Sequence, residues 1–203
     1  MYGLVLFIYH SSFPEIPRPY HIITYNIDFH YKWVYLLLTP FTLLIALASH
    51  IHAIPIKLQI RVNSYRKLLG FYFTQTSMMA LWGTCLIGVI SFLCFPIASK
   101  QVTIDDFLHI CCLLFFCYIN LINIGLLLIL LAKRFSVQIG FLLVMLMSLA
   151  DQYVFGHIIF TSTRLLYRPI WSWQGFMFPL IENLLIMAVF LLLLSMQLHK
   201  KGA

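Results

Sequence analysis

The histidines are the first residues of this sequence whose type could support metal or haem binding. His50 and His52 flank a single isoleucine at the end of an apolar run. In a helix, side chains two positions apart point in different directions, so a metal shared by this pair would require extended backbone. We therefore favour two imidazoles at a membrane interface, and the roles of both histidines stay open.

The cysteines could act as nucleophiles, metal ligands or disulfide partners, but all of them lie within or beside apolar runs. Their number is odd and none of them forms a CxxC motif, which argues against a disulfide framework or a zinc site. No HExxH, P-loop or paired-carboxylate motif accompanies them. We expect free thiols, no metal site, no cofactor in this chain and no catalytic activity. The cysteines are Cys85, Cys94, Cys111, Cys112 and Cys117.

Two acidic residues lie in or beside apolar runs, where a carboxylate is costly. Glu182 lies within the last apolar run, and Asp151 ends the run before it. Charged groups inside a membrane usually face protein or water, so both residues are candidates for a transport pathway. The alternative for Glu182 is an interfacial position or an ion pair with Arg164 or Arg168. For Asp151 we favour an interfacial position.

The composition points to a membrane protein. The chain is 62% hydrophobic and 9% charged, with a mean hydropathy of +0.95. A soluble domain carries about 25% charged residues, so this chain lacks the polar side chains to cover its own surface. Its net charge of +7 comes from bases in short loops, which indicates membrane topology and not nucleic-acid binding. We predict an all-α, polytopic membrane protein with a single domain over residues 1–203.

Hydropathy divides the chain into about six transmembrane helices. Residues 1–9 are apolar but too few to cross a bilayer, so the first helix is short or truncated, or the segment is interfacial and five helices cross. The other spans are predicted at residues 33–49, 70–95, 107–132, 137–150 and 176–198.

Local signals predict where several of these helices begin and end. Pro96 is expected to end the third helix, since proline breaks the helical hydrogen bonding. Asp105 and Asp106 suit the first turn of the fourth helix, where the helix dipole is positive. A very short turn after Lys133 and Arg134 makes the fourth and fifth helices antiparallel neighbours.

Residues 51–69 form the longest basic interruption between two apolar runs, and they contain no acid. Such a segment between two spans is expected in the cytoplasm. The loops assigned with it to the cytoplasm hold eight Lys and Arg residues, against five in the outer loops. This places the chain in the plasma membrane with a cytoplasmic C-terminus. The segment can be drawn as a helix along the membrane surface that turns into the next span.

This layout resembles the small ABC-2-type permease subunits of bacterial ABC transporters. The resemblance rests on residues 60–67 (I-R-V-N-S-Y-R-K), on the tight turn after Arg134 and on the lysines near the C-terminus. In that family, the segment matching residues 60–67 is a coupling helix that docks into the ATP-binding subunit. The resemblance implies that the coupling residues are Gln59, Arg61, Asn63, Ser64, Arg66 and Lys67.

The same resemblance implies the partners and the cargo. A second permease chain, identical or a sister chain, would complete the pathway, and ATP and Mg²⁺ would bind in a separate ATPase subunit. The cargo would be a peptide or another amphipathic molecule, and export is favoured. Two alternatives stay open: a membrane-embedded peptide-processing enzyme that uses a cysteine with His50 or His52, and a stand-alone immunity or sensor protein.

Overall fold

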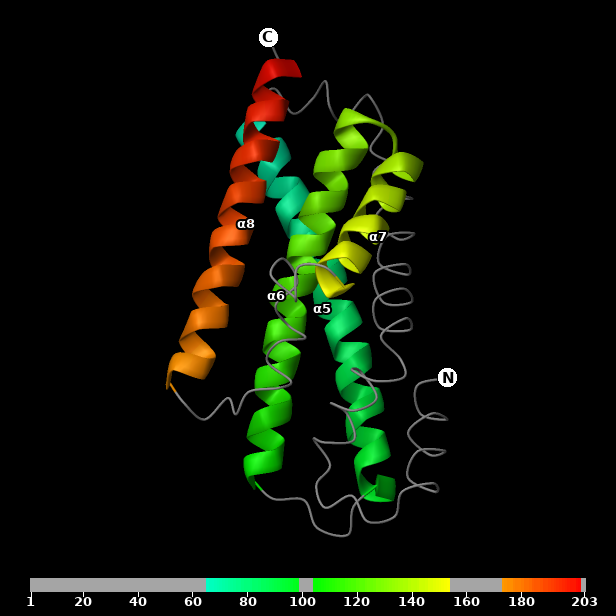
Figure 1. The fold of residues 1–203 in the computed structure, drawn as a ribbon, viewed down its shortest axis with the longest axis vertical. Coiled ribbons are helices and arrows are strands. Elements are labelled where there is room, and N and C mark those ends of the chain that lie inside the picture. Colours follow the sequence, from blue (N-terminus) through cyan, green and yellow to red (C-terminus); the bar gives the residue numbers. More distant parts are fainter. Residues whose placement is uncertain (1–64, 99–103, 154–172, 202–203) are drawn as a thin grey trace.

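The computed structural model describes residues 65–98, 104–153 and 173–201, and every element within these ranges is a helix (Figure 1). The helices are α5 (Tyr65–Ala98), α6 (Ile104–Arg134), α7 (Val137–Tyr153) and α8 (Trp173–Lys201). The all-α class is therefore confirmed for the described part of the chain. The predicted spans at residues 1–9 and 33–49 lie outside it, so the number of six spans stays a prediction.

Helix α6 is the centre of the described bundle. It packs against α5, α7 and α8, and residues 119–129 are buried on every side of the helix. A helix that is apolar all round needs neighbours on all its faces, and this sequence of α6 supplies that pattern. Two segments, Leu114–Arg134 of α6 and Phe176–His199 of α8, are long and apolar enough to cross a membrane by length and composition.

Helix α5 runs antiparallel to α6 and crosses it (Figure 1). Its buried positions recur every four residues, which places them on one stripe of the helix. Most of them are small, so the two backbones can approach closely. The hydroxyl of Thr76 donates to the Tyr72 carbonyl at 2.8 Å, and Thr84 does the same to Ala80 at 2.8 Å. These local bonds satisfy both hydroxyls without water. The stripe consists of Tyr72, Thr76, Ala80, Thr84 and Gly88.

Helix α7 folds back along the second half of α6 after a two-residue turn (Figure 1). Ser136 caps α7, because its hydroxyl accepts from the Ile139 N–H at 3.2 Å. Gly140 lies so close to α6 that an added Cβ would stand 2.9 Å from the Ala132 nitrogen. The absence of a side chain at this position therefore sets the approach of the two helices.

Helix α8 runs parallel to α6 and contacts it along one narrow face. Phe116 and Phe176 meet edge to face with ring centroids 5.3 Å apart, and Asn123 meets Asn183 one heptad later on both helices. The opposite face of α8 is apolar and exposed: the exposed fraction of Phe178 is 67%. Only 11% of the apolar segment of α8 is buried, against 72% in α6.

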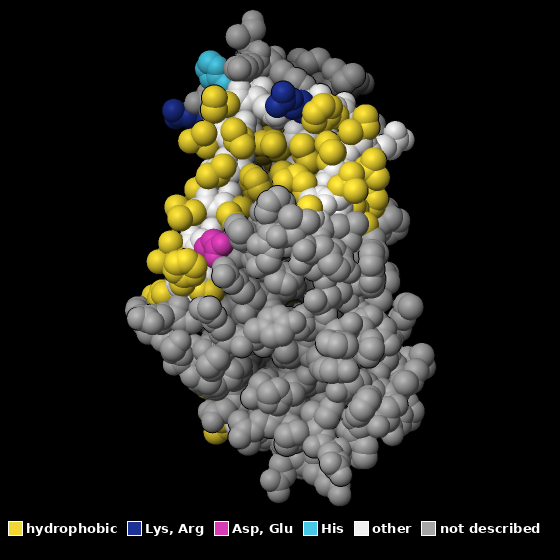
Figure 2. Space-filling view, viewed as in Figure 1, with side chains coloured by type: hydrophobic (Ala, Val, Ile, Leu, Met, Phe, Trp, Pro, Cys, Tyr) yellow, Lys and Arg dark blue, Asp and Glu magenta, His cyan; other side chains and the backbone are white. Residues whose placement is uncertain are grey.

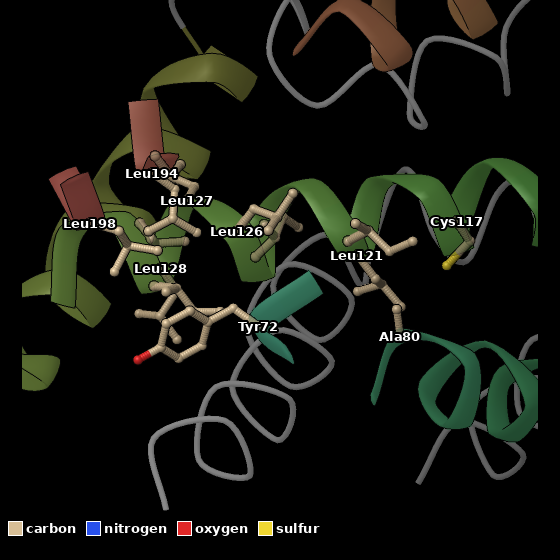
Figure 3. Packing of buried hydrophobic residues seen from close by; sticks show 13 residues of the cluster. Tyr72, Ala80, Cys117, Leu121, Leu126, Leu127, Leu128, Leu194 and Leu198 are labelled. Atoms are coloured by element: carbon tan, nitrogen blue, oxygen red, sulfur yellow. The ribbon is translucent and has the colours of Figure 1, made fainter. Parts of the chain in front are cut away.

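The apolar core lies between α6 and its three neighbours: it runs from Cys117 to Ile129 of α6 and includes Val144 of α7. Figure 3 shows Tyr72 of α5 beside Leu128 of α6 and Leu198 of α8, while Ala80 lies near Leu121 and Cys117. Large exposed side chains such as Trp82, Leu142 and Leu185 surround this core on the outer faces of the helices. An outer surface of this kind suits lipid far better than water.

The helix boundaries agree with most of the local signals. Asp105 and Asp106 lie in the first turn of α6, and α6 ends at Arg134, as predicted. The prediction that Pro96 ends α5 is wrong, since α5 continues to Ala98. Proline there removes one hydrogen bond near the helix end, a loss that helices in membranes tolerate. Helix α8 begins at Trp173, earlier than the span predicted from residue 176.

Candidate functional site

A pair of buried asparagines joins the middle of α6 to α8. The Asn123 Nδ2 donates to both the backbone carbonyl and the Oδ1 of Asn183, each at 3.2 Å. The Asn183 Nδ2 donates in turn to the Pro179 carbonyl of its own helix at 2.9 Å. Both asparagines are 0% exposed. The Asn183 amide is thus engaged at both of its polar atoms.

The pair lies deep in the apolar part of the bundle. Asn123 is about 16 Å from the end of α6 by helical rise, close to the middle of a bilayer core that is about 30 Å thick. The Oδ1 of Asn123 is buried and has no hydrogen-bond partner among the described residues. One acceptor in the seam between α6 and α8 therefore remains able to bind water or a polar group. Asn120, one turn earlier on α6, is also buried.

Glu182 adjoins this pair, because it precedes Asn183 on α8. Its side chain is half-buried, at the border between the α6-facing seam and the exposed face. Asp151 lies in the last turn of α7. The structure thus brings one of the two predicted pathway acids next to a buried polar pair.

A second polar contact joins α5 to α6. The Ser77 hydroxyl and the Tyr118 hydroxyl form a hydrogen bond between the two helices. In the described residues, the α5–α6 interface and the α6–α8 interface thus each contain a polar contact between the two helices. Such contacts in membrane helices contribute about 0.6 kcal/mol on average, so they align helices more than they stabilise the bundle.

Basic side chains gather at one end of the bundle, where α5 begins and where α6 and α8 end. On the face drawn in Figure 2, Lys or Arg side chains and a His side chain lie at this end, above a band of hydrophobic side chains. We call this the basic end. It comprises the exposed Arg66, Lys67, Arg134 and His199 and the half-buried Lys133, and Lys200 and Lys201 follow in the last turn of α8.

Lys133 extends from the basic end over α5. Its Nζ lies 5.2 Å from the centroid of the Tyr72 ring, within the range of a cation–π interaction. Tyr72 is 1% exposed, and its hydroxyl has no hydrogen-bond partner among the described residues. The Oε1 of Gln197, near the end of α8, is also buried without such a partner within the same ranges.

The predicted coupling residues are only partly described. Arg66 and Lys67 lie in the first turn of α5 and are exposed. They belong to the same helix as the apolar segment that follows, with no break between them. Gln59, Arg61, Asn63 and Ser64 lie outside the described residues, as do His50 and His52, so the coupling helix itself stays a prediction.

The asparagine pair was missed by sequence reasoning, although a signal existed. Asn120 and Asn123 are three residues apart, so they share a helix face, and they stand in an apolar run. Asn183 follows Glu182 directly and is a second polar residue in the last apolar run. The spacing locates the polar faces of the two helices, but it does not tell which helix faces which.

Possible metal ligands do not cluster in the described ranges, where no group of three His, Cys, Asp or Glu residues could hold an ion. Four described cysteines are free thiols: Cys85, Cys111, Cys112 and Cys117. Comparisons of the whole chain with protein-family models, with curated proteins and with solved structures found no match.

Proposed function

We propose that this chain is the membrane-spanning, non-catalytic subunit of an ABC transporter in the plasma membrane. Two permease chains would form the pathway, and a separate subunit would bind ATP and Mg²⁺ and hydrolyse ATP. The basic end faces the cytoplasm and docks that subunit, and the cargo is a peptide or another amphipathic molecule. Export is the direction we favour.

The observation that carries the proposal is the continuity of α5. Its first turn presents Arg66 and Lys67 to solvent, and the same helix then packs against α6 through Thr76 and Ala80. A partner that moves the basic end would move the whole of α5, since an α-helix transmits displacement along its axis. The motion would reach the seams of α6.

The position of the two bases supports a role beyond local helix stability. Arg66 and Lys67 stand at the N-terminus of α5, where the helix dipole disfavours cations. Lys133 and Arg134 stand at the C-terminus of α6, where the dipole favours them. The bases of α5 therefore require another reason, and cytoplasmic orientation together with a partner surface provides one.

The pathway side of the proposal uses the asparagine pair. A partly buried carboxylate beside a buried amide acceptor is the kind of polar group that guides a cargo across an apolar bundle. Glu182 and the free acceptor of Asn123 would line the pathway, and Asp151 would lie near the outer end of α7. Because the face of α8 opposite α6 is exposed, α8 could shift against α6 during transport without displacing another described helix.

The test is co-purification of ATPase activity. The tagged chain is purified in mild detergent from the cells that encode it, and Mg²⁺-dependent ATP hydrolysis is measured. Wild type should carry this activity. The double variant Arg66→Glu with Lys67→Glu should lose it at least about tenfold, because reversed charges at an interface repel the partner.

The control variant reverses one charge in a segment that the sequence predicts on the opposite side of the membrane. Lys100→Glu changes a base in a segment predicted on the outer side, and it should retain the co-purifying activity. Absence of ATPase activity from the wild-type preparation would overturn the proposal. So would full activity in the double variant, provided that its amount in the membrane equals that of wild type.

A further inference from the structure

The basic end contains two buried polar atoms that have no hydrogen-bond partner among the described residues. The Tyr72 hydroxyl and the Gln197 Oε1 are both buried and lack hydrogen bonds among the described residues. A buried polar group in this condition costs about 1–3 kcal/mol, so native proteins usually supply a partner from water, an ion or a ligand. Two such atoms in one end of the bundle indicate a place where something else binds.

The direction of the tyrosine locates that place. Figure 3 shows the Tyr72 hydroxyl pointing to the side of Leu198 and Leu128, away from Ala80 and Cys117. This is the side on which α6 and α8 end. Lys133 covers the same ring with its ammonium group 5.2 Å from the centroid. A phenol donor and a lysine ammonium therefore lie together, at the level where α6 and α8 approach the surface.

The charge around this point selects the kind of ligand. Arg66 and Lys67 of α5 and Arg134 of α6 are exposed at the same end. The acidic residue with a described side chain, Glu182, lies about 25 Å away along α8 by helical rise. The excess of positive charge at this end favours an anionic ligand, and each base near a membrane surface attracts anionic lipid by about 1 kcal/mol.

We infer that the basic end binds the headgroup of an anionic phospholipid. Lys133 pairs with the phosphate, the Tyr72 hydroxyl donates a hydrogen bond to a phosphate oxygen, and Arg66 or Lys67 supplies further charge. The Gln197 Oε1 accepts from a headgroup hydroxyl or from a water that accompanies it. Charge-assisted bonds of this kind are about twice as strong as neutral ones.

This inference rests on the cytoplasmic orientation in the proposed function but not on the ATPase. Lipid occupancy would fix the start of α5 against the end of α6. It would thereby keep the first turn of α5 in place for its partner. Because the lipid test uses the purified chain alone, its failure leaves the ATPase test unaffected, and the converse also holds.

The experiment measures thermal unfolding of the full chain in a neutral detergent. Phosphatidylglycerol, phosphatidylcholine with the same acyl chains, or sodium phosphate is added over a range of concentrations. We expect phosphatidylglycerol to raise the melting temperature and the other two to leave it unchanged. Lys133→Gln should remove the response to phosphatidylglycerol, whereas Arg134→Gln, at an exposed neighbouring base, should retain most of it.

A second variant separates lipid binding from a purely structural role of the tyrosine. Tyr72→Phe keeps the ring and removes the hydroxyl that lacks a partner, so without lipid it should be at least as stable as wild type. With phosphatidylglycerol it should require about fivefold more lipid for the same shift, the equivalent of one lost hydrogen bond.

Three outcomes would overturn the inference. Equal stabilisation by phosphatidylcholine would mean a general effect of lipid, and equal stabilisation by sodium phosphate would mean a site for free anions. An unchanged lipid response in both Lys133→Gln and Tyr72→Phe would place the lipid elsewhere on the protein.

Discussion

The side chain of Asn183 forms hydrogen bonds with two helices, α6 and its own helix α8. Its Oδ1 accepts from Asn123 of α6, and its Nδ2 donates to the Pro179 carbonyl within α8. Pro179 lacks an N–H and so interrupts the regular bonding of α8 at this level. The Asn183 side chain therefore links the Pro179 carbonyl of α8 to the buried centre of α6.

We predict that Asn183→Leu destabilises the bundle by about 1–2 kcal/mol, because the buried Asn123 amide loses the Asn183 Oδ1 and keeps only the Asn183 backbone carbonyl as acceptor. The measurement is unfolding by denaturant in detergent or bicelles. Leu185→Ala, at a position that is 61% exposed, should change stability by less than about 0.5 kcal/mol. Equal effects of the two substitutions would contradict the role of the pair.

A double-mutant cycle with Asn123→Leu then isolates the interhelical bond. We expect a coupling free energy between the two sites of up to about 1.7 kcal/mol. Replacing both asparagines should cost less than the sum of the two single changes, since neither amide is then left buried alone. A coupling of zero would show that the two amides act independently.

The contact between α6 and α7 depends on a glycine. A Cβ at Gly140 would stand 2.9 Å from the Ala132 nitrogen and 3.2 Å from its Cα, and both are backbone atoms that cannot turn aside. We predict that Gly140→Ala lowers stability by about 1–3 kcal/mol, as overpacking does. Gly70→Ala is the control, because a Cβ there would meet nothing within 4 Å, and it should be neutral or slightly stabilising. Similar results for the two glycines would refute the close approach.

The contact between α5 and α6 depends on small side chains. Ala80 is 0% exposed and lies against Leu121 and Cys117 (Figure 3). We predict that Ala80→Leu destabilises the bundle by about 1–3 kcal/mol, because the added methyl groups would separate the two helices. The same change at the exposed Ala188 of α8 should have little effect. The stability of both variants is measured from the denaturant midpoint of unfolding. An unchanged stability of Ala80→Leu would mean that the α5–α6 interface is loosely packed.

At the scale of the whole molecule, the described basic side chains gather at one end. The basic end joins bases from the start of α5 and the ends of α6 and α8, which are far apart in the sequence. On the face drawn in Figure 2, a band of described hydrophobic side chains lies next to the basic end. In a membrane this arrangement favours the basic end on the cytoplasmic side.

Single cysteines placed in a variant without the native cysteines test this orientation. We predict that an impermeant maleimide labels Ile104→Cys in intact cells but labels His199→Cys only after the cells are opened. Both positions are exposed, and Ile104 is 81% exposed. Labelling of His199→Cys alone in intact cells would reverse the orientation, and labelling of both would contradict a helix that crosses the membrane between them.

The amino-acid sequence by itself determined the helical class, the residues at which several helices begin or end, and the positions of the Lys and Arg residues beside the apolar runs. Hydropathy and proline, glycine and charge signals are local, so they can be read without knowing any neighbour. The turn after Arg134 and the acidic start of α6 were predicted for this reason. Pro96 was an exception, because the tolerance of a proline near a helix end depends on what surrounds it.

Only the tertiary structure decided which faces meet. The burial of α6 on every side, the bond between Asn123 and Asn183 and the position of Lys133 over Tyr72 all depend on contacts between residues distant in sequence. An amide or a lysine in an apolar run has the same local signal whether it faces lipid, a helix or a ligand. Its partner is set by how the helices pack, and packing is a property of the whole bundle.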